Sequence, residues 1–557
     1  MKTASVVLCI CCCLSGVNAQ QPLIGVVDTV GGTTLDDLTN GPAWRMLVNT
    51  PGHGMHAVWM YSGDTSGALL DRNIRYNFYD YVTGAWSYPD SDFMQGGVYV
   101  FVGRAGYGSI DIDTNGVAVI SAHHATTGAN FAPIVARDVD VGQAIFDYSP
   151  GEPTLDGYVW PCVGVGMNGY YHLAMLENAT QDNLYWGRMT SWPTWDAAVS
   201  MPSPQPEPLF PDHNIATSKV PGSNKVCITW VAVPATGAAQ MPGFYRESRD
   251  GGDHWDTPLD IGFPPAFHPG SETVPSYHVS SLFPLYDRND NLHIVGNVSP
   301  FVRDTFWPNL SEIWHFCPDN TPSWTRIHRA GSYSLLAPMG NNATYACRPS
   351  IGEDNRGGLH VAWEQFDSAN VETTSNRLRA DIFYTMDDYD NGASWLPAMR
   401  ITEQGTWSCR FPSAIDHFEG DTFSVLYLMD QCAGVGRYGE GPVTENPVVV
   451  RRVVWTGLAE GKGPAILSTE LSAAPNPFSQ ATTFSYQLGR AGTAALSIQD
   501  VTGRAVRRLA GGLQPAGSHS VLWDGRDDRG RALRVGVYFC TLDIGAKRIS
   551  RKVVLTE

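Results

Sequence analysis

The chain has 557 residues, of which 43% are apolar and 17% are charged, and its formal net charge at pH 7 is −18. This composition is typical of a folded protein and excludes long disordered stretches. The acidic balance argues against nucleic-acid backbones and anionic membranes as partners, so we expect neither nucleic-acid binding nor membrane insertion.

The first 19 residues have the features of a secretory signal peptide. Lys2 gives a positive start, residues 6–14 form a short apolar run, and residues 17–19 (Val-Asn-Ala) form a small-residue cleavage site. We therefore expect a mature chain that begins at Gln20 and works outside the cell or on its outer surface. The apolar run is too short to cross a bilayer.

Seven of the 11 cysteines lie after residue 19. They are scattered and include no CxxC pair, so we predict no zinc site and no other metal or cofactor. Export permits disulfides, and an odd number of cysteines leaves at least one of them unpaired. The seven are Cys162, Cys227, Cys317, Cys347, Cys409, Cys432 and Cys540.

One unit recurs through residues 20–457: an opening strand, a turn with Asp and Gly, a second strand, a long loop, an aromatic strand and a turn that ends at Trp. The clearest copy has its second strand at residues 360–363 (His-Val-Ala-Trp). Seven such second strands lie near residues 58, 119, 173, 228, 294, 361 and 425. This spacing predicts an all-β propeller of four-stranded blades. Seven blades are expected, with six as the alternative if one weak copy is not a blade.

One turn of this repeat is more specific. Ser248, Asp250, Gly252 and Trp255 fit the pattern S/T-x-D-x-G-x-x-W. The chain therefore resembles the Asp-box propellers (bacterial neuraminidase repeats), which include sialidases. The resemblance implies that the Asp closes a hairpin turn and that the Trp packs between strands, without any chemistry.

Two acidic runs resemble metal-binding sites in composition. Residues 111–116 (Asp-Ile-Asp-Thr-Asn-Gly) resemble the start of a calcium loop, but they lack the closing glutamate and fall where other repeats have their first turn. Asp524, Asp527 and Asp528 lie close together near the C-terminus. We interpret both runs as turns, with a bound ion as the alternative.

The C-terminal part differs from the rest. After a linker at 458–467, residues 468–557 are rich in basic residues and short alternating strands, with Ala-Pro-Asn-Pro-Phe at 474–478 and Trp-Asp-Gly at 523–525. They resemble type IX secretion sorting domains and the related hook-capping-protein-like Ig modules. The resemblance implies a small Ig-like β-sandwich and an export machinery as its partner.

The blade pattern indicates where a ligand site lies. First-to-second and third-to-fourth turns share one end of a propeller, the turn face, whereas the second-to-third loops and the links between blades share the other, the loop face. Long loops carry function on rigid scaffolds. We therefore expect a glycan or a surface protein to bind at the loop face, near the axis. The long loops are predicted at 61–75, 123–132, 235–243, 300–310, 365–379 and 429–446.

Three arginines open inner strands at this face. Arg348 and Arg410 share a Cys-Arg-(Phe)-Pro-Ser context, and Arg45 lies in a similar but shifted place. They resemble the carboxylate-binding triad of sialidases, and guanidinium groups bind carboxylates in bidentate fashion. The alternative is that these arginines hold neighbouring inner strands together. Cys347 and Cys409 precede two of them, which allows a disulfide between adjacent blades.

A sialidase-like glycoside hydrolase also needs a Tyr nucleophile, a carboxylate that assists it and an acid/base Asp. Tyr427, Glu364 and Asp64 are the candidates, although the usual opening motif of the family is absent. His123 and His124 are adjacent on a strand and point to opposite faces, so packed or solvated histidines are favoured over a metal pair. The functions left open are a glycan- or protein-binding propeller, a sialidase-like hydrolase and a structural component of a surface layer.

Overall fold

The computed structural model describes residues 25–454 and 471–556, with gaps at 40, 67, 126–130, 150–155, 180–182, 197–198, 202–208, 233–240, 265–275, 303–304, 489–491, 502–503, 515–516 and 545–546. The predicted signal peptide and the predicted linker lie outside the described residues.

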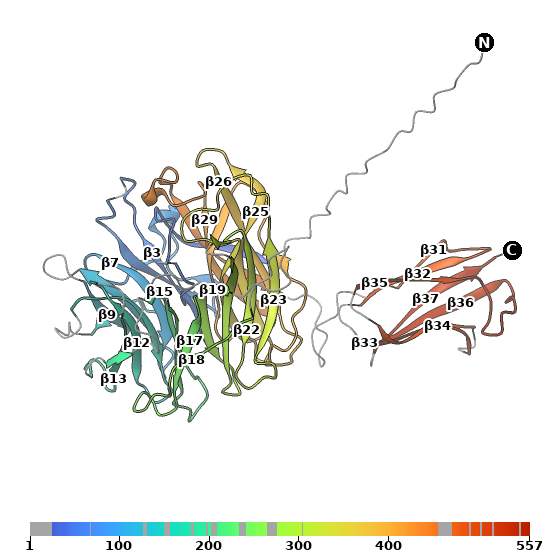
Figure 1. The fold of residues 1–557 in the computed structure, drawn as a ribbon, viewed down its shortest axis with the longest axis horizontal. Helices are drawn as coiled ribbons and strands as arrows, with labels where there is room; N and C mark the ends of the chain where they lie inside the picture. Colours follow the sequence, from blue (N-terminus) through green and yellow to red (C-terminus); the bar gives the residue numbers. More distant parts are fainter. Residues whose placement is uncertain are drawn as a thin grey trace, which may run out of the picture.

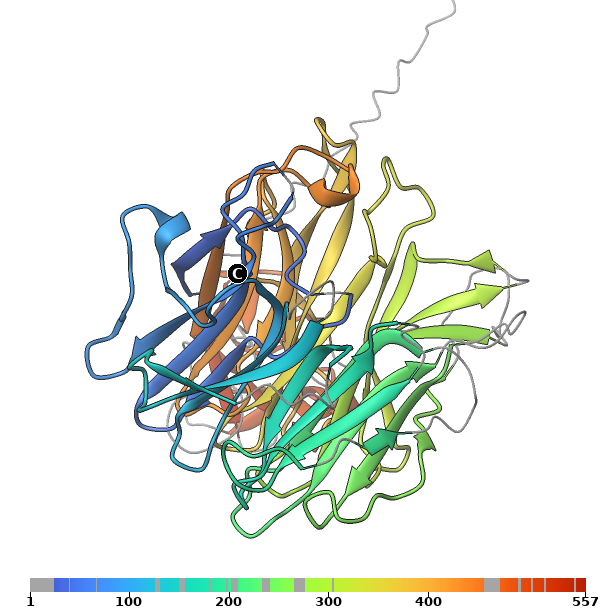
Figure 2. The same cartoon turned by 90° about the vertical axis from the view of Figure 1, so that its left-hand side faces the viewer.

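Residues 26–454 form seven sheets of four or five strands, which lie side by side in chain order (Figure 1). Figure 2 shows that the first and last parts of this run, coloured blue and orange, are neighbours. The ring is therefore closed, and the chain contains a seven-bladed β-propeller, as the repeat predicts.

Each blade runs outward from an inner strand at the axis. The inner strands are β2 (Leu47–Thr50), β7 (Ala105–Ile112), β11 (Tyr158–Val165), β15 (Leu209–Thr217), β19 (Ser276–Tyr286), β24 (Ala346–Glu353) and β28 (Ser408–Ala414). The second strands are β3 (Gly54–Tyr61), β8 (Ala118–Ala125), β12 (Tyr171–Glu177), β16 (Val226–Ala232), β20 (Leu292–Val302), β25 (Leu359–Glu372) and β29 (Thr422–Asp430).

The outer strand has only two or three residues in five of the seven blades. The third strands are β4 (Asn73–Asp80), β9 (Phe131–Asp138), β13 (Leu184–Met189), β17 (Gly243–Ser248), β22 (Leu310–Phe316), β26 (Arg377–Met386) and β30 (Asn446–Val454). The outer strands are β5 (Ala85–Trp86), β10 (Phe146–Tyr148), β14 (Val199–Met201), β18 (Leu259–Asp260), β23 (Trp324–Gly331), β27 (Met399–Arg400) and β1 (Val26–Thr33). Short additions are β6 (Val98–Tyr99), β21 (Thr305–Phe306) and the 3-10 turns η1 (Phe93–Gln95) and η3 (Gly436–Tyr438).

The N-terminal strand closes the ring. β1 pairs antiparallel with β30 and becomes the outer strand of the last blade, so residues from both ends of the propeller share one sheet. Its packing against the first blade is close, because a Cβ added at Gly31 would lie 2.1 Å from the ring of Trp59. Only glycine fits there.

The seven predicted second strands are confirmed. In chain order they are β3, β8, β12, β16, β20, β25 and β29, and most of their residues are buried. Strands buried on both faces have nearly continuous apolar sequences, which explains why these were the clearest signals. Two loop predictions are wrong in part. Most of residues 365–379 extends the β25–β26 hairpin, because the two strands remain paired as far as Glu372 and Arg377. In the predicted loop at 300–310, β20 continues to Val302 and pairs with β21.

Residues 472–555 form two further sheets, with strand orders β31-β32-β35 and β34-β33-β36-β37. A core of buried side chains lies between them, including Phe484, Leu496, Trp523, Leu542 and Val553. The strands are β31 (Ser472–Ala474), β32 (Thr482–Leu488), β33 (Gly492–Gln499), β34 (Ala505–Gln514), β35 (Gly517–Trp523), β36 (Gly536–Ile544) and β37 (Lys547–Leu555). This is the Ig-like sandwich expected from the sequence.

Among the described residues, no helix has the length and apolarity needed to cross a membrane.

Candidate functional site

Residues 41–46, which link β1 to β2, enter the centre of the propeller from the loop face. The carbonyl of Ala43 accepts a hydrogen bond from Asn214 Nδ2 at 2.9 Å, and its N–H donates to Ser281 Oγ at 2.7 Å. Trp44 is completely buried. The segment joins inner strands of separate blades and fills the axis. A ligand at the loop face would therefore contact the inner strands beside the axis and not at its centre.

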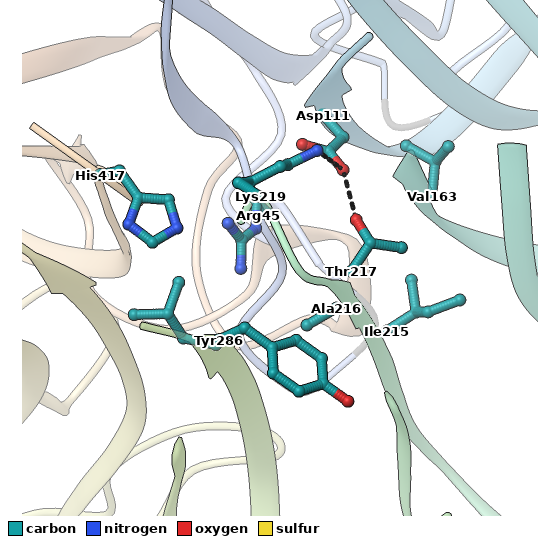
Figure 3. Close-up of a pocket in the computed structure, with 10 residues that line it drawn as sticks. Arg45, Asp111, Val163, Ile215, Ala216, Thr217, Lys219, Tyr286 and His417 are labelled. Carbon is teal, nitrogen blue, oxygen red and sulfur yellow. Dashed lines mark hydrogen bonds and ion pairs between the residues drawn. The ribbon is translucent and has the colours of Figure 1, made fainter. Parts of the chain in front are cut away.

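A cavity of about 10 Å³, room for about one water molecule, remains further along the axis (Figure 3). The Lys219 ammonium there already pairs with Asp111 at 2.8 Å, and Arg45 Nη2 donates to the Pro284 carbonyl at 3.2 Å. Ligand pockets usually exceed about 300 Å³. Because the cavity is small and its cations have partners, we do not place the main site there. Its lining is Arg45, Asp111, Val163, Ile215, Ala216, Thr217, Lys219, Leu285, Tyr286 and His417.

Two of the three predicted carboxylate-binding arginines converge on a carboxylate of the protein itself. Arg348 Nη1 forms a short ion pair with Glu364 Oε1, and Arg410 Nη2 lies 3.4 Å from the same oxygen. The three side chains are at most 2% exposed. Burial alone would raise the pKa of Glu364, but the two arginines outweigh it and lower the pKa. The geometry is that of the alternative interpretation, in which the arginines join neighbouring inner strands.

The remaining predicted site residues lie elsewhere, so the sialidase-like set does not assemble. Arg45 is directed to Asp416, with 3.8 Å between Nη1 and Oδ2. Tyr427 is buried, and its hydroxyl accepts a hydrogen bond from Arg451 Nε at 3.3 Å. Asp64 accepts hydrogen bonds from backbone N–H groups of its own loop.

The disulfide between Cys347 and Cys409 is wrong, because both thiols are free. Cys347 Sγ donates to Glu364 at 3.2 Å. Ser350 of β24 and Ser413 of β28 hold the same position in the pairing with the second strand of their blades. Three residues before each serine, Cys347 therefore corresponds to Arg410 and not to Cys409. Consecutive residues of a strand point to opposite faces, which separates the two thiols.

The turn motif at residues 248–255 is a turn in the structure. Asp250 Oδ1 accepts the His254 N–H at 2.9 Å, and the Trp255 ring packs on Trp186 of the neighbouring blade at 5.3 Å. Ser248 Oγ accepts the Gly252 N–H at 2.8 Å.

The acidic runs close turns in the same way. Asp113 Oδ1 accepts the Asn115 N–H at 2.8 Å, and its other oxygen pairs with Arg137 at 2.8 Å. Asp527 closes its turn by accepting the Arg531 N–H at 2.9 Å. Within the described part of the chain, no three His, Cys, Asp or Glu side chains are placed to hold a metal ion.

A different group of residues has the properties of a site. The loop-face cluster consists of Arg72, Tyr107, His123, Trp160 and Arg437, which come from the first, second, third and last blades. Arg437 Nη1 donates to the Tyr107 hydroxyl at 2.8 Å, and the Arg72 guanidinium carbon lies 5.2 Å from the centre of the Tyr107 ring. The rings of His123 and Trp160 lie 5.4 Å and 6.4 Å from that ring. The cluster thus combines two guanidinium groups with three rings.

The backbone of the inner strands places two of these rings. Tyr107 and Trp160 have φ values of 55° and 54°, and each lies at a bulge where the register with the second strand shifts. Residues with side chains rarely adopt this left-handed conformation, and it costs about 1–3 kcal/mol. Ser281, Arg348 and Phe411 adopt the same conformation at the corresponding bulges of β19, β24 and β28, so the bulge is a feature of the repeated inner strand and not of this cluster alone.

The cluster extends from the interior to the surface. Arg72, Tyr107 and His123 are nearly buried, whereas Trp160 is half-buried and the Arg437 side chain is 22% exposed. Tyr438, next to Arg437, is 47% exposed. The outer members can therefore meet a ligand directly.

Burial perturbs the titration of the cluster. It lowers the pKa of Arg72 to about 10 and the pKa of His123 well below its usual value. It raises the pKa of Tyr107 to about 12 and that of Asp37, the ion-pair partner of Arg437, to about 7. Several perturbed groups in one place mark a candidate functional site.

The sequence had given weak signals of this cluster. Arg72 and Arg437 lie in two of the predicted long loops, but nothing distinguished them from other loop residues. His123 was expected to be packed or solvated, and its ring packs on Phe131 at 4.9 Å. No pattern indicates that these residues meet, because the contact depends on the order of blades around the ring.

Comparison with known proteins identifies the C-terminal part. Residues 474–543 match the FlgD Ig-like domain. No curated protein matches the chain.

Three solved structures are similar to the chain at low identity. An ulvan lyase of polysaccharide lyase family PL25, bound to -[GlcA(1-4)Rha3S]-, is 12% identical over 77% of this chain and 96% of its own, with a TM-score of 0.45. The polysaccharide lyase Uly1 is 11% identical over 74% and 90%, with a TM-score of 0.39. The Penicillium chrysogenum α-L-arabinanase is 9% identical over 77% and 98%, with a TM-score of 0.36. Likeness at this level does not extend to activity.

Proposed function

We propose that the protein is an exported β-propeller that binds an acidic carbohydrate at the loop-face cluster. The observation that carries this proposal is the convergence of Arg72 and Arg437 on Tyr107. Guanidinium groups recognise carboxylate and sulfate oxygens through paired charge-assisted hydrogen bonds. The half-buried Trp160 and the exposed Tyr438 supply apolar ring faces, on which sugar rings stack.

The sialidase-like alternative is less well supported. Its arginines need a free approach for the substrate carboxylate, whereas Glu364 already occupies Arg348 and Arg410. Arg437 also has a carboxylate partner, Asp37 at 3.3 Å, but its side chain is 22% exposed, whereas Arg348 and Arg410 are at most 2% exposed.

Binding of uronic-acid oligosaccharides, measured by calorimetry against neutral oligosaccharides of equal length, tests the proposal. Arg437→Gln removes one charge and is expected to weaken uronate binding about 10- to 100-fold, the equivalent of a lost charged hydrogen bond. Arg137→Gln is the matched control, because Arg137 is 24% exposed and also pairs with one aspartate. Equal affinity for acidic and neutral sugars, or equal effects of the two variants, would refute the proposal.

We further propose that the chain leaves the cell through its signal peptide and its C-terminal domain, with a type IX export machinery as the partner of that domain. The match of residues 474–543 to an Ig-like domain supports a separate module suited to this task. Deletion from Leu471 onward should leave the propeller in the periplasm. Normal export of the shortened chain, detected by cell fractionation, would contradict the sorting role.

A further inference from the structure

Arg104 is a partly exposed arginine beside the loop-face cluster, directly before the inner strand β7. Its Nε donates to the Leu69 carbonyl at 3.2 Å, and the same carbonyl accepts the Arg72 N–H at 3.3 Å. The next residue, Ala105, donates its N–H to the Arg72 carbonyl at 3.0 Å and accepts from Arg72 Nε at 3.3 Å. Arg104 is therefore held next to Arg72, a member of the cluster.

The outer end of the Arg104 guanidinium is free. Within the described residues neither Nη1 nor Nη2 has an acceptor, and neither atom is buried. The neighbouring chain is open as well, since Val102 is 90% exposed and Leu70 is 78% exposed. Because Nε is held by a carbonyl, the two Nη groups form a fork that matches the two oxygens of a carboxylate or sulfate. A ligand oxygen can therefore reach this fork in the structure as it stands.

The arginines around Tyr107 bring more positive charge than their partners neutralise. In the described part of the chain, Arg72, Arg104 and Arg437 share one ion-pair partner, Asp37, which lies 3.3 Å from Arg437. Burial is the main cause of the low pKa of Arg72, and the charge of Arg104 lowers that pKa further. The charge of Arg104 thus acts on the cluster, and a ligand with a single anionic group would leave part of the excess unpaired.

Arg104 and Arg437 lie within reach of one extended ligand. Arg437 donates to the Tyr107 hydroxyl at 2.8 Å, and Tyr107 lies three residues after Arg104. At about 3.3 Å per residue, the Cα atoms of Arg104 and Tyr107 are at most about 10 Å apart. Both guanidinium groups reach the surface, so two acidic groups of one chain of sugars can contact them at the same time.

We propose that Arg104 forms a second anion-binding subsite, and that the ligand is an oligosaccharide with acidic groups on more than one sugar. Nη1 and Nη2 of Arg104 bind one carboxylate or sulfate, while Arg437 binds another. This inference rests on the proposed function, which requires only one acidic group. It adds that the affinity depends on how many acidic groups the ligand carries.

Calorimetry with two trisaccharides of equal length tests the second subsite in the full chain. One probe is trigalacturonate, which has three carboxylates, and the other is a galactose trisaccharide with a single terminal galacturonate. The wild type should bind trigalacturonate about 10- to 100-fold more tightly than the singly charged probe, the equivalent of one charged hydrogen bond. Arg104→Gln should bring the two affinities together.

Two further variants serve as controls. Arg246→Gln is matched, because Arg246 in the fourth blade is also partly exposed and donates from Nε to a backbone carbonyl, and it should keep the full preference. Arg104→Lys keeps the charge without the fork and should keep part of it. If the wild type binds both probes equally, or if Arg104→Gln keeps the preference, the inference is overturned while the proposed function stands. If the wild type binds neither probe, both are overturned.

Discussion

Replacement of Glu364 by Gln tests the role of the buried ion-pair network. The side chain is completely buried and is the common partner of Arg348 and Arg410, and it also accepts the Phe411 N–H at 2.8 Å. Glu364→Gln keeps the shape but leaves two buried guanidinium groups without a counter-charge. Breaking a buried pair in this way costs about 3–5 kcal/mol. The free energy of unfolding of the propeller should fall by that amount.

Urea unfolding followed by tryptophan fluorescence measures the loss, because Trp523 is the one tryptophan after residue 468 and the signal reports on the propeller. The control is Arg249→Gln, which removes an ion pair to Glu247 from a side chain that is 73% exposed. Exposed pairs contribute about 0–1 kcal/mol. If Glu364→Gln costs no more than this control, the arginines do not depend on Glu364, and their assignment as a structural network is refuted.

Three further outcomes are expected. The folded-state pKa of Asp37 is raised from 3.8 to about 7, so its contribution to stability is present below pH 4 and is lost as the pH rises through 7. Between pH 4 and pH 8, the unfolding free energy of Asp37→Asn should therefore fall by about 4 kcal/mol less than that of the wild type. An equal fall in both proteins, measured by urea unfolding at the two pH values, would contradict this. The seven cysteines after residue 19 are buried and free, so a thiol reagent should label seven groups of the mature chain after denaturation and almost none before, whereas fewer in the denatured, unreduced chain would reveal a disulfide. Asp250→Ala removes the acceptor of the His254 N–H and should lower stability by about 1–2 kcal/mol; no change in the urea midpoint would show that the turn closes without it.

The sequence predicted the propeller well because the blade signal is local. Each second strand is a short apolar run bounded by a turn and a loop, as at residues 359–366, so seven strands were found without knowledge of their contacts. The sandwich was found in the same way. Strand ends were less certain, since the β25–β26 hairpin continues through polar residues that resemble a loop.

The candidate site was harder to predict because it depends on register and on contacts between blades. Arg348 and Arg410 have nearly the same neighbours in sequence, but Phe411 adds one residue before the shared Pro-Ser pair. A shift of one residue changes the face of a strand on which a side chain lies. Arg348 corresponds in register to Phe411, and the two arginines reach Glu364 by different routes. An alignment of the two sequence motifs on their arginines does not show this difference in register.

The filled axis explains why the loop-face cluster lies to one side of the propeller. Had the axis been open, inner-strand residues of all blades would have been equivalent, and the arginines nearest the centre would have been the best candidates. Segment 41–46 removes that equivalence, because its Trp44 ring packs on Tyr107 at 6.2 Å and on His213 at 6.4 Å. The same ring thus supports the residue that Arg437 contacts and the residue that holds the Trp160 carbonyl. A segment that closes the channel therefore also sets the geometry of the site beside it.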